Sequence, residues 1–356
     1  MWIQKRGRMV EEVKRKQLFN ENGDIELSKR RMINGNTTNL NDFNNMKYTW
    51  VSDWYRHAMN NFWIPEEINL TQDIKDYRNL EIEEKEAYDK ILSFLIFLDS
   101  LQTANLPNVG EFITANEVNL CLTIQAYQEA IHSQSYGYIL DTICSPEERT
   151  EILYQWKDDP FLLARNKFIG DQYNDFYYNR TKYNLVKTVV ANYILEGIYF
   201  YSGFMFFYAL GRNGKMPGTV QEIRYINRDE NSHLWLFRSI ILELKKEEPE
   251  LFTPENIEVF RNMIRQGVEE EIKWANCVIG DHIKGLNMQM VEDYLKYLGN
   301  LRCRGLGFEP IYEGYQREPE SMSWVSEYSD PNAIKTDFFE GKVSAYAKSS
   351  VIEDDL

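Results

Sequence analysis

Gln125-Ala-Tyr-Gln-Glu129-Ala-Ile-His132-Ser-Gln-Ser-Tyr136 is the stretch of the chain that decides the fold. On a helix, Glu129, His132 and Tyr136 fall at positions i, i+3 and i+7, so a carboxylate, an imidazole and a phenol share one face. The Glu-x-x-His spacing returns at Glu230 and His233, which accounts for two of the four histidines. Two such motifs, with one carboxylate from each of two further helices, are how a four-helix bundle builds a carboxylate-bridged two-metal site.

Asp99 and Glu196 are the candidates for the two single carboxylates. Both adjoin the most apolar stretches of the chain, Ile91–Leu98 and Ile198–Leu210. A carboxylate buried there is costly unless it is neutralised or bound to a cation. Asp99 lies 30 residues before Glu129, and Glu196 lies 34 before Glu230. Each interval suits two adjacent antiparallel helices, so the sequence predicts two similar halves that each supply one carboxylate and one Glu-x-x-His.

The helical pattern extends over most of the chain. We expect helices over about 81–104, where Leu106-Pro107 would end the first, and over about 111–143, 183–210 and 288–304. Ser145-Pro146, the capping-box spacing of Thr219 and Glu222, and Thr253-Pro254 would open three more. With no credible strand pair in residues 46–316, the sequence predicts an all-α bundle with a dinuclear metal site in its core. A polar, Asn-rich N-terminal arm (1–45) and a flexible C-terminal tail (317–356) would flank it.

Composition excludes several classes of function. The formal net charge of −15 argues against a nucleic-acid binder, and we find no Gly-rich phosphate loop. The four cysteines form no C-x-x-C pair and the N-terminus lacks an apolar signal region, so we expect reduced thiols and a cytoplasmic protein. The longest apolar run, Ile198–Leu210, is too short to span a bilayer, so we expect a buried helix and no membrane association.

The proposed ligands suit two dications. Four carboxylates and two imidazoles form an oxygen-rich set appropriate to divalent iron or manganese, and four negative charges balance two dications. Any one of these residues alone is better explained as a stray polar group in a helical core, but the combined motifs and intervals disfavour that interpretation. His57 and His282 lack the spacing and are interpreted as ordinary surface or capping histidines. Tyr136 should stand beside one metal, enclosed by Phe200, Phe204 and Ile226, where a sheltered phenol can persist as a radical.

The chain resembles the small, radical-bearing subunit of class I ribonucleotide reductase from about Trp63 to its C-terminus. The resemblance rests on the opening motif and on Phe62-Trp63-Ile-Pro65-Glu-Glu, Leu98-Asp99-Ser-Leu-Gln102, Leu195-Glu196 and Arg228-Asp229-Glu230-x-x-His233. It implies a ferritin-like helical bundle. It also implies that Asp99, Glu129 and His132 bind one metal, and that Glu196, Glu230 and His233 bind the other.

The resemblance also implies a path for a radical. Tyr136 matches the tyrosine that bears it, and Trp63 and Asp229 match a relay that passes an electron and a proton by way of His132. In the tail, Tyr346 resembles an interfacial tyrosine and Glu340 a nearby tail glutamate. The metal pair would activate oxygen and oxidise Tyr136, and the oxidising equivalent would reach a cysteine of a separate large subunit, which reduces ribonucleotides to deoxyribonucleotides.

Partners and cofactors follow from the same resemblance. It implies a homodimer whose C-terminal tail docks on the large subunit, while nucleotide substrate binds elsewhere. His132-Ser-Gln-Ser-Tyr136 and Glu271-Ile-Lys-Trp274 are similar to the iron-dependent subgroup, which implies two iron ions as a di-iron-oxo pair. Phe200-Tyr-Ser-Gly-Phe204 is similar to a subgroup that uses manganese and a flavoprotein activator. A di-manganese or mixed manganese–iron pair therefore stays open.

Two other functions are compatible with a helical dinuclear site. One is another ferritin-like di-metal oxidase, such as an acyl desaturase or a ligand-binding oxidase, which would bind a lipid and give the tail no role. The other is an iron-storage protein, which would assemble as a many-subunit cage. The length of the chain and its tail argue against storage, and solution mass separates a dimer from a cage.

Overall fold

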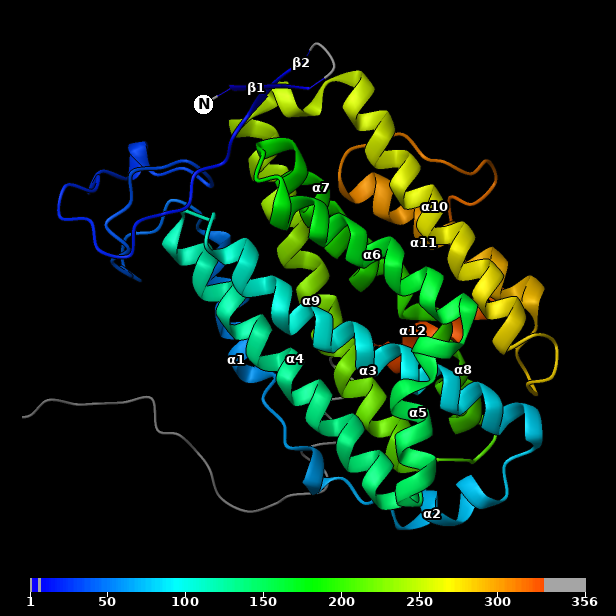
Figure 1. Ribbon diagram of the computed structural model, residues 1–356. Helices are drawn as coiled ribbons and strands as arrows, with labels where there is room; N and C mark the ends of the chain where they lie inside the picture. The colour runs from blue at the N-terminus through cyan, green and yellow to red at the C-terminus, as the bar shows by residue number, and fades with distance from the viewer. Residues whose placement is uncertain (1, 6–7, 330–356) are drawn as a thin grey trace, which may run out of the picture.

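Four long helical segments form the centre of the computed structural model, which describes residues 2–5 and 8–329 (Figure 1). They are α3 (Ile82–Gly110), α4 (Asn116–Ile143), the run from α7 (Lys182–Ile194) into α8 (Tyr201–Arg212), and α9 (Pro217–Glu247). Helix α3 packs on α4, α9 packs on both α7 and α8, and α4 packs on α9. The two pairs are those that the intervals between carboxylate and Glu-x-x-His predicted, and the all-α, ferritin-like fold is confirmed.

Shorter helices surround this centre and close it from solvent. Helices α1 and α2 cover α4 and α9, α5 and α6 cover α3, α10 and α11 cover the segment between α7 and α8, and α12 packs on α8 and α9. Their bounds are Trp50–Asn60 (α1), Thr71–Arg78 (α2), Pro146–Asp158 (α5), Pro160–Tyr178 (α6), Pro254–Val278 (α10), Met288–Gly305 (α11) and Ser323–Ser329 (α12). Single 3₁₀ turns occur at Leu27–Lys29, Pro65–Glu67, Pro249–Phe252 and Glu320–Met322.

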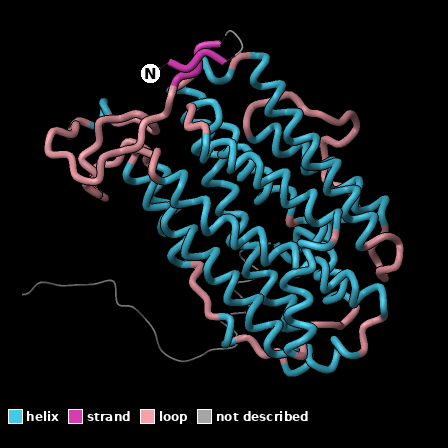
Figure 2. The backbone as a smooth tube through the Cα atoms, viewed as in Figure 1, coloured by secondary structure: helices cyan, strands magenta, loops and turns pink. Residues whose placement is uncertain are grey.

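The N-terminal arm contains the strands of the described chain. Strands β1 (Trp2–Lys5) and β2 (Arg8–Glu11) form an antiparallel hairpin that the sequence analysis did not predict (Figure 2). Loops then run over the surface as far as α1. Met32 and Ile33 fix the arm to the bundle, since both are completely buried.

Several helix ends differ from the predictions. Helix α3 contains Pro107 and continues to Gly110, and α4 begins at Asn116 rather than near 111. Ser145 and Thr253 cap α5 and α10 as expected. The predicted Thr219 capping box is wrong, because α9 begins at Pro217 and has no side-chain cap of its own. The carboxylate of Asp73 accepts hydrogen bonds from the Gly218 and Thr219 amides instead.

The apolar run before Leu210 is a core helix, as predicted. Lys182–Arg212 is long and apolar enough to cross a membrane, yet 94% of its most apolar window is buried inside the protein. Within it, Leu195–Tyr199 is π-helical, which the sequence analysis did not predict.

The start of the expected flexible tail is folded. Met322, Trp324 and Val325 are buried, and the ring of Tyr328 stacks on Tyr208 with centroids 4.7 Å apart. The prediction of a tail from 317 is therefore wrong for residues 320–329, because these apolar side chains cover α8 and α9.

Candidate metal centre

The six residues that the sequence singled out converge in the middle of the bundle. Asp99 comes from α3, Glu129 and His132 from α4, Glu196 from the π-helical segment, and Glu230 and His233 from α9. Each is 1% exposed or less. Their ligand atoms form two groups, and within each group all atoms lie within 4.8 Å of one another. Glu129 and Glu230 belong to both groups, so the two groups share two carboxylates.

The first group is Asp99, Glu129, His132 and Glu230. The Nδ1 atom of His132 lies 3.1 Å from Glu230 Oε1, 3.5 Å from Glu129 Oε2 and 3.7 Å from Asp99 Oδ2. One imidazole nitrogen therefore faces three carboxylates around a common centre.

The second group is Glu129, Glu196, Glu230 and His233. The Nδ1 atom of His233 lies 2.9 Å from Glu230 Oε2, 3.3 Å from Glu129 Oε1 and 4.0 Å from Glu196 Oε2. The arrangement repeats that of the first group. The imidazole rings of His132 and His233 are 5.8 Å apart.

Outer partners orient both imidazoles. The Nε2 atom of His132 faces Asp229 Oδ2 at 3.4 Å, and the Nε2 atom of His233 faces Gln128 Oε1 at 3.0 Å. A metal-binding histidine typically gives its second ring nitrogen to a carboxylate or carbonyl oxygen, which fixes the tautomer and the ring orientation. Both rings thus present Nδ1 to the carboxylates.

Two buried glutamines support the carboxylates. Gln102 Nε2 donates to Glu196 Oε1 at 2.6 Å, and Gln125 Nε2 donates to both Glu129 Oε1 and Glu196 Oε1. No role was predicted for these glutamines from the sequence. The position of Gln125 gave a signal, because it precedes Glu129 by four residues, which places it beside that carboxylate. Gln102 gave none, because it bonds to Glu196 on another helical segment.

The buried carboxylates of the centre are a favourable site for cations. Within the described part of the chain, both oxygens of Asp99, Oε2 of Glu129 and Oε2 of Glu196 are buried without a hydrogen-bond partner. Burial raises the pKa of Asp99 and of Glu196 well above the ordinary value, and neighbouring glutamates add to each rise. Burial would lower the pKa of His132, but hydrogen bonds to Asp229 and to the glutamates raise it instead. These unpaired oxygens and the two imidazoles fit a pair of divalent ions.

Tyr136 lies at the edge of the first group. Its side chain is 1% exposed, and its hydroxyl has no well-formed hydrogen bond within the described residues. Burial raises the pKa of Tyr136 well above its ordinary value, and the adjacent Asp99 carboxylate raises it further. The phenol is therefore protonated and dry. Phe200, Phe204 and Ile226 are buried in the same core.

Trp63 and Asp229 continue the site toward the surface. Trp63 Nε1 donates to Asp229 Oδ2 at 2.9 Å, and the same oxygen faces His132 Nε2. The ring of Trp63 lies 6.4 Å from that of His132. The structure thus brings Trp63, Asp229 and His132 into one hydrogen-bonded series. Tyr346 and Glu340 lie outside the described residues.

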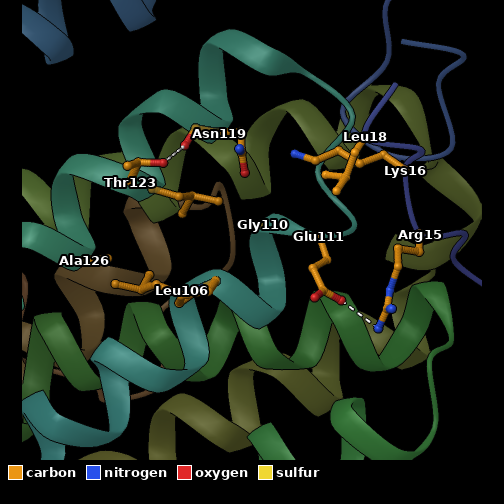
Figure 3. Close-up of a pocket in the computed structure, with 11 residues that line it drawn as sticks. Arg15, Lys16, Leu18, Leu106, Gly110, Glu111, Asn119, Thr123 and Ala126 are labelled. Atoms are coloured by element: carbon orange, nitrogen blue, oxygen red, sulfur yellow. Dashed lines mark hydrogen bonds and ion pairs between the residues drawn. The ribbon is translucent and has the colours of Figure 1, made fainter. Parts of the chain in front are cut away.

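Two surface pockets near the N-terminal arm lie away from this centre. One of about 400 Å³ lies between the arm and the ends of α3 and α4, where Arg15 pairs with Glu111 (Figure 3). A neighbouring polar pocket of about 490 Å³ also includes Arg15 and Lys16. Neither contains a residue of the two ligand groups. The centre is enclosed by packed helices.

A bundle with two Glu-x-x-His helices and two shared carboxylates belongs to the class of ferritin-like proteins with a dinuclear metal site. Residues 40–319 match the family model of the ribonucleotide reductase small chain, and this protein belongs to that family. It is 73% identical over 344 residues to a ribonucleoside-diphosphate reductase subunit beta of Treponema pallidum (strain Nichols), covering 97% of this chain and 98% of that one. It therefore has the role of the radical-generating subunit, which works with a large subunit.

Solved structures agree with this assignment. An R2 subunit of ribonucleotide reductase from Clostridium botulinum superposes with a TM-score of 0.87 at 50% identity, covering 90% of this chain and all of that one. A dimanganese(II) NrdF of Streptococcus sanguinis shares the fold, with a TM-score of 0.67 at 22% identity over 82% of this chain and 99% of that one. Membership of this family excludes the desaturase, ligand-binding oxidase and iron-storage alternatives.

Proposed function

We propose that Asp99, Glu129, His132, Glu196, Glu230 and His233 hold a metal pair and that Tyr136 carries the radical. The observation that supports this most directly is the pair of ligand groups that share Glu129 and Glu230, with a dry phenol beside Asp99. When bound, the metal pair supplies the one-electron oxidation of the phenol by means of oxygen or an oxygen-derived oxidant. The packed helices keep water away, so that an oxidised Tyr136 persists.

Trp63, Asp229 and His132 form the proposed relay. Asp229 Oδ2 accepts the indole hydrogen bond and faces the imidazole, so it can hold a proton between the two rings as an electron passes. Asp229 Oδ1 accepts from Arg228 at 3.3 Å, which fixes the carboxylate. Beyond Trp63 the path would continue through Glu340 and Tyr346 to a cysteine of the large subunit.

The proposed assembly is a homodimer in the cytoplasm whose C-terminal tail docks on the large subunit. The proposed cofactor is a pair of iron ions. A di-manganese or mixed manganese–iron pair, with a flavoprotein activator for manganese, is the alternative because of the Phe200-Tyr-Ser-Gly-Phe204 motif. Metal analysis of protein from its native host decides between them.

The test combines metal analysis with electron paramagnetic resonance. Wild-type protein should contain two metal ions per chain and give a tyrosyl radical signal. Tyr136→Phe should keep both ions but lose that signal and all turnover with the large subunit. Tyr88→Phe is the matched control, since Tyr88 is a fully buried tyrosine of α3 that bonds Thr219 instead. An unchanged radical spectrum in Tyr136→Phe would place the radical elsewhere, and fewer than two ions in the wild type would reject the dinuclear site.

A further inference from the structure

We propose that Arg165, Glu271 and Arg302 are positioning residues that hold the π-helical segment and thereby set the place of Glu196. We call these three residues the clamp. The inference deepens the proposed function and rests on it, because it concerns the ion that Glu196 helps to bind. None of the three residues belongs to the ligand groups.

The π-helical segment is where the second ligand group is most easily displaced. Asp99 and His132 belong only to the first group, whereas Glu196 and His233 belong only to the second. Glu196 is also the one ligand of the described set that lies on π-helical backbone. Such a turn widens the helix and departs from the regular bonding pattern, so its geometry depends on outside contacts.

Arg302 of α11 holds this segment next to Glu196. Its Nε atom donates to the carbonyl of Gly197 at 2.9 Å, and its Nη2 donates to the Tyr201 hydroxyl at 3.3 Å. A Cβ atom at position 197 would lie 2.7 Å from Arg302 Nε and 2.8 Å from Leu234 Cδ1, so only glycine lets the guanidinium approach. The residue that follows the ligand is thus adapted to the arginine that holds it.

Arg165 and Glu271 hold the other end of the segment. Arg165 Nη2 donates to the Tyr199 carbonyl at 3.1 Å and pairs with Glu271 at 2.5 Å. Glu271 Oε1 accepts from the amide of Ser202 at 3.1 Å, at the start of α8. The guanidinium of Arg165 also lies over the rings of Phe94, Tyr199 and Trp274 at 3.9 to 4.9 Å.

The chemistry of the clamp argues against a role in packing alone. Arg165, Glu271 and Arg302 are 2%, 0% and 7% exposed, and burying charged side chains is unfavourable where apolar ones would fill the space. Their polar atoms bond to the backbone of residues 197, 199 and 202, on one side of the ligand. Losing these bonds would free the backbone that carries Glu196 while leaving α3 and α4 in place.

The test titrates the full-length chain with manganese(II) chloride and follows unbound manganese by electron paramagnetic resonance. Arg302→Met should weaken the binding of one of the two ions about 10- to 100-fold, which is the range typical for outer partners of a metal ligand. The affinity for the other ion should stay within about threefold of the wild type. Arg302→Lys should recover part of the loss, since an ammonium is a donor at the same place. Arg238→Met is the matched control, because Arg238 Nε donates to a glycine carbonyl, that of Gly305, outside the π-helical segment.

The identity of the weakened ion provides a second readout. Adding His233→Ala to Arg302→Met should further weaken only the ion that Arg302→Met already weakens, whereas adding His132→Ala should weaken the binding of the other ion. Circular dichroism checks that each variant is folded. A folded Arg302→Met that binds both ions like the wild type, or loses both equally, would overturn the inference.

Gly197→Ala keeps the test decisive if Arg302→Met fails to fold. The added methyl group presses on the guanidinium and on Leu234, which adjoins His233, without removing a charge. Both neighbours lie on the side of the second group, so the same selective loss of one ion is expected. Wild-type binding of both ions by folded Gly197→Ala would overturn the clamp. A wild-type protein that binds fewer than two ions would instead overturn the metal centre itself, and the clamp with it.

Discussion

Asp229 occupies the junction between a buried indole and a buried imidazole. Its Oδ2 atom accepts from Trp63 at 2.9 Å and faces His132 at 3.4 Å, while Arg228 holds its other oxygen. The carboxylate can therefore balance a positive charge on either ring. An amide of the same shape could accept the indole hydrogen bond but would carry no charge.

The first prediction is that Asp229→Asn lowers turnover with the large subunit about 10- to 100-fold, as expected for an outer partner of a metal-site histidine. The Tyr136 radical should remain, because the six proposed ligands are unchanged. Turnover assays and electron paramagnetic resonance on one sample separate the two effects. Asp141→Asn, at an exposed position that pairs with Arg149, is the control. Turnover within threefold of the wild type would show that the charge of Asp229 is dispensable.

Glu222 gives a prediction about pH. It is completely buried on α9, and its two oxygens have no well-formed hydrogen bond within the described residues. Burial raises the pKa of Glu222 from 4.5 to about 9, against an opposing effect of Ser135. The folded state then holds a proton that the unfolded state releases. Stability should fall by about 1.4 kcal/mol per pH unit as pH rises from about 4.5 toward 9.

Glu222→Gln should remove this dependence, because the amide stays neutral. The free energy of unfolding of the variant, relative to the wild type, should rise by up to about 4 kcal/mol between pH 5 and pH 8. Urea unfolding at the two pH values measures it, and taking the difference between variant and wild type cancels the titration of other groups. Glu313→Gln, at an exposed position, should show no such trend. A constant difference for Glu222→Gln would mean that Glu222 ionises in the folded protein.

At the residue scale, the sequence predicted the centre better than its surroundings. Four of the six proposed ligands follow the Glu-x-x-His spacing, the other two lie at similar intervals before them, and the structure brings all six together. Arg165, Glu271 and Arg302 could not be inferred in the same way. Each reaches the π-helical segment from a helix distant in sequence, and no local pattern indicates a contact between residues 197 and 302.

At the scale of elements, the C-terminus of α9 fastens the N-terminal arm. The carboxylate of Glu247 accepts from the Met32 amide at 2.8 Å, from Lys47 Nζ at 2.6 Å and from the Tyr48 hydroxyl at 2.7 Å. Glu248 pairs with Arg31 and with Lys182. The last residue of α9 and the residue that follows it thus bind the segment from Arg31 to Tyr48 at several points.

Glu247→Ala should release the arm and leave the centre intact. Loss of the three hydrogen bonds should lower the free energy of unfolding by about 1 to 3 kcal/mol, because the Met32 amide, the Lys47 ammonium and the Tyr48 hydroxyl lose their acceptor. We expect faster proteolysis between residues 12 and 49 and an unchanged metal content. Glu243→Ala, one turn earlier, removes only a bond to the exposed Lys246 and is the control. Equal proteolysis of the two variants would show that Glu247 does not hold the arm.

Helix ends were predictable only where the signal was local. The caps of α5 and α10 come from the residues that precede them. The cap of α9 comes from Asp73, more than 140 positions away, so the sequence pointed to Thr219 instead. Pro107 predicted an end to α3, but a proline near the last turn removes only one backbone donor, and the helix continues to Gly110.

At the scale of the whole molecule, the centre is sealed while the partner of this chain is a separate subunit. The proposed connection is the C-terminal tail, whose root at α12 packs on α8 and α9. The guanidinium carbon of Arg212 lies 4.5 Å from the centroid of the Trp324 ring, and the ring of Tyr328 stacks on that of Tyr208.

Deleting residues 347–356 should leave two ions per chain and an unchanged radical signal. Binding to the large subunit should weaken at least about tenfold, equivalent to about 1.4 kcal/mol. Sedimentation of the mixed subunits measures binding, and a solution mass near twice 42.3 kDa checks that the dimer persists. A peptide of the same ten residues should compete with the full chain, and a scrambled peptide should not. Undiminished binding of the shortened chain would assign docking to another surface.

The end of α12 at Ser329 also limits how far the proposed docking segment can reach. The 27 residues from 330 to 356 can span no more than about 97 Å when fully extended. In the proposed docking mode, a large subunit bound by the last residues of the tail is confined to a small volume around this chain, where its effective concentration far exceeds that in free solution. If the folded parts of the two subunits separate while the tail stays bound, they would then rebind rapidly, because the tail keeps them close together.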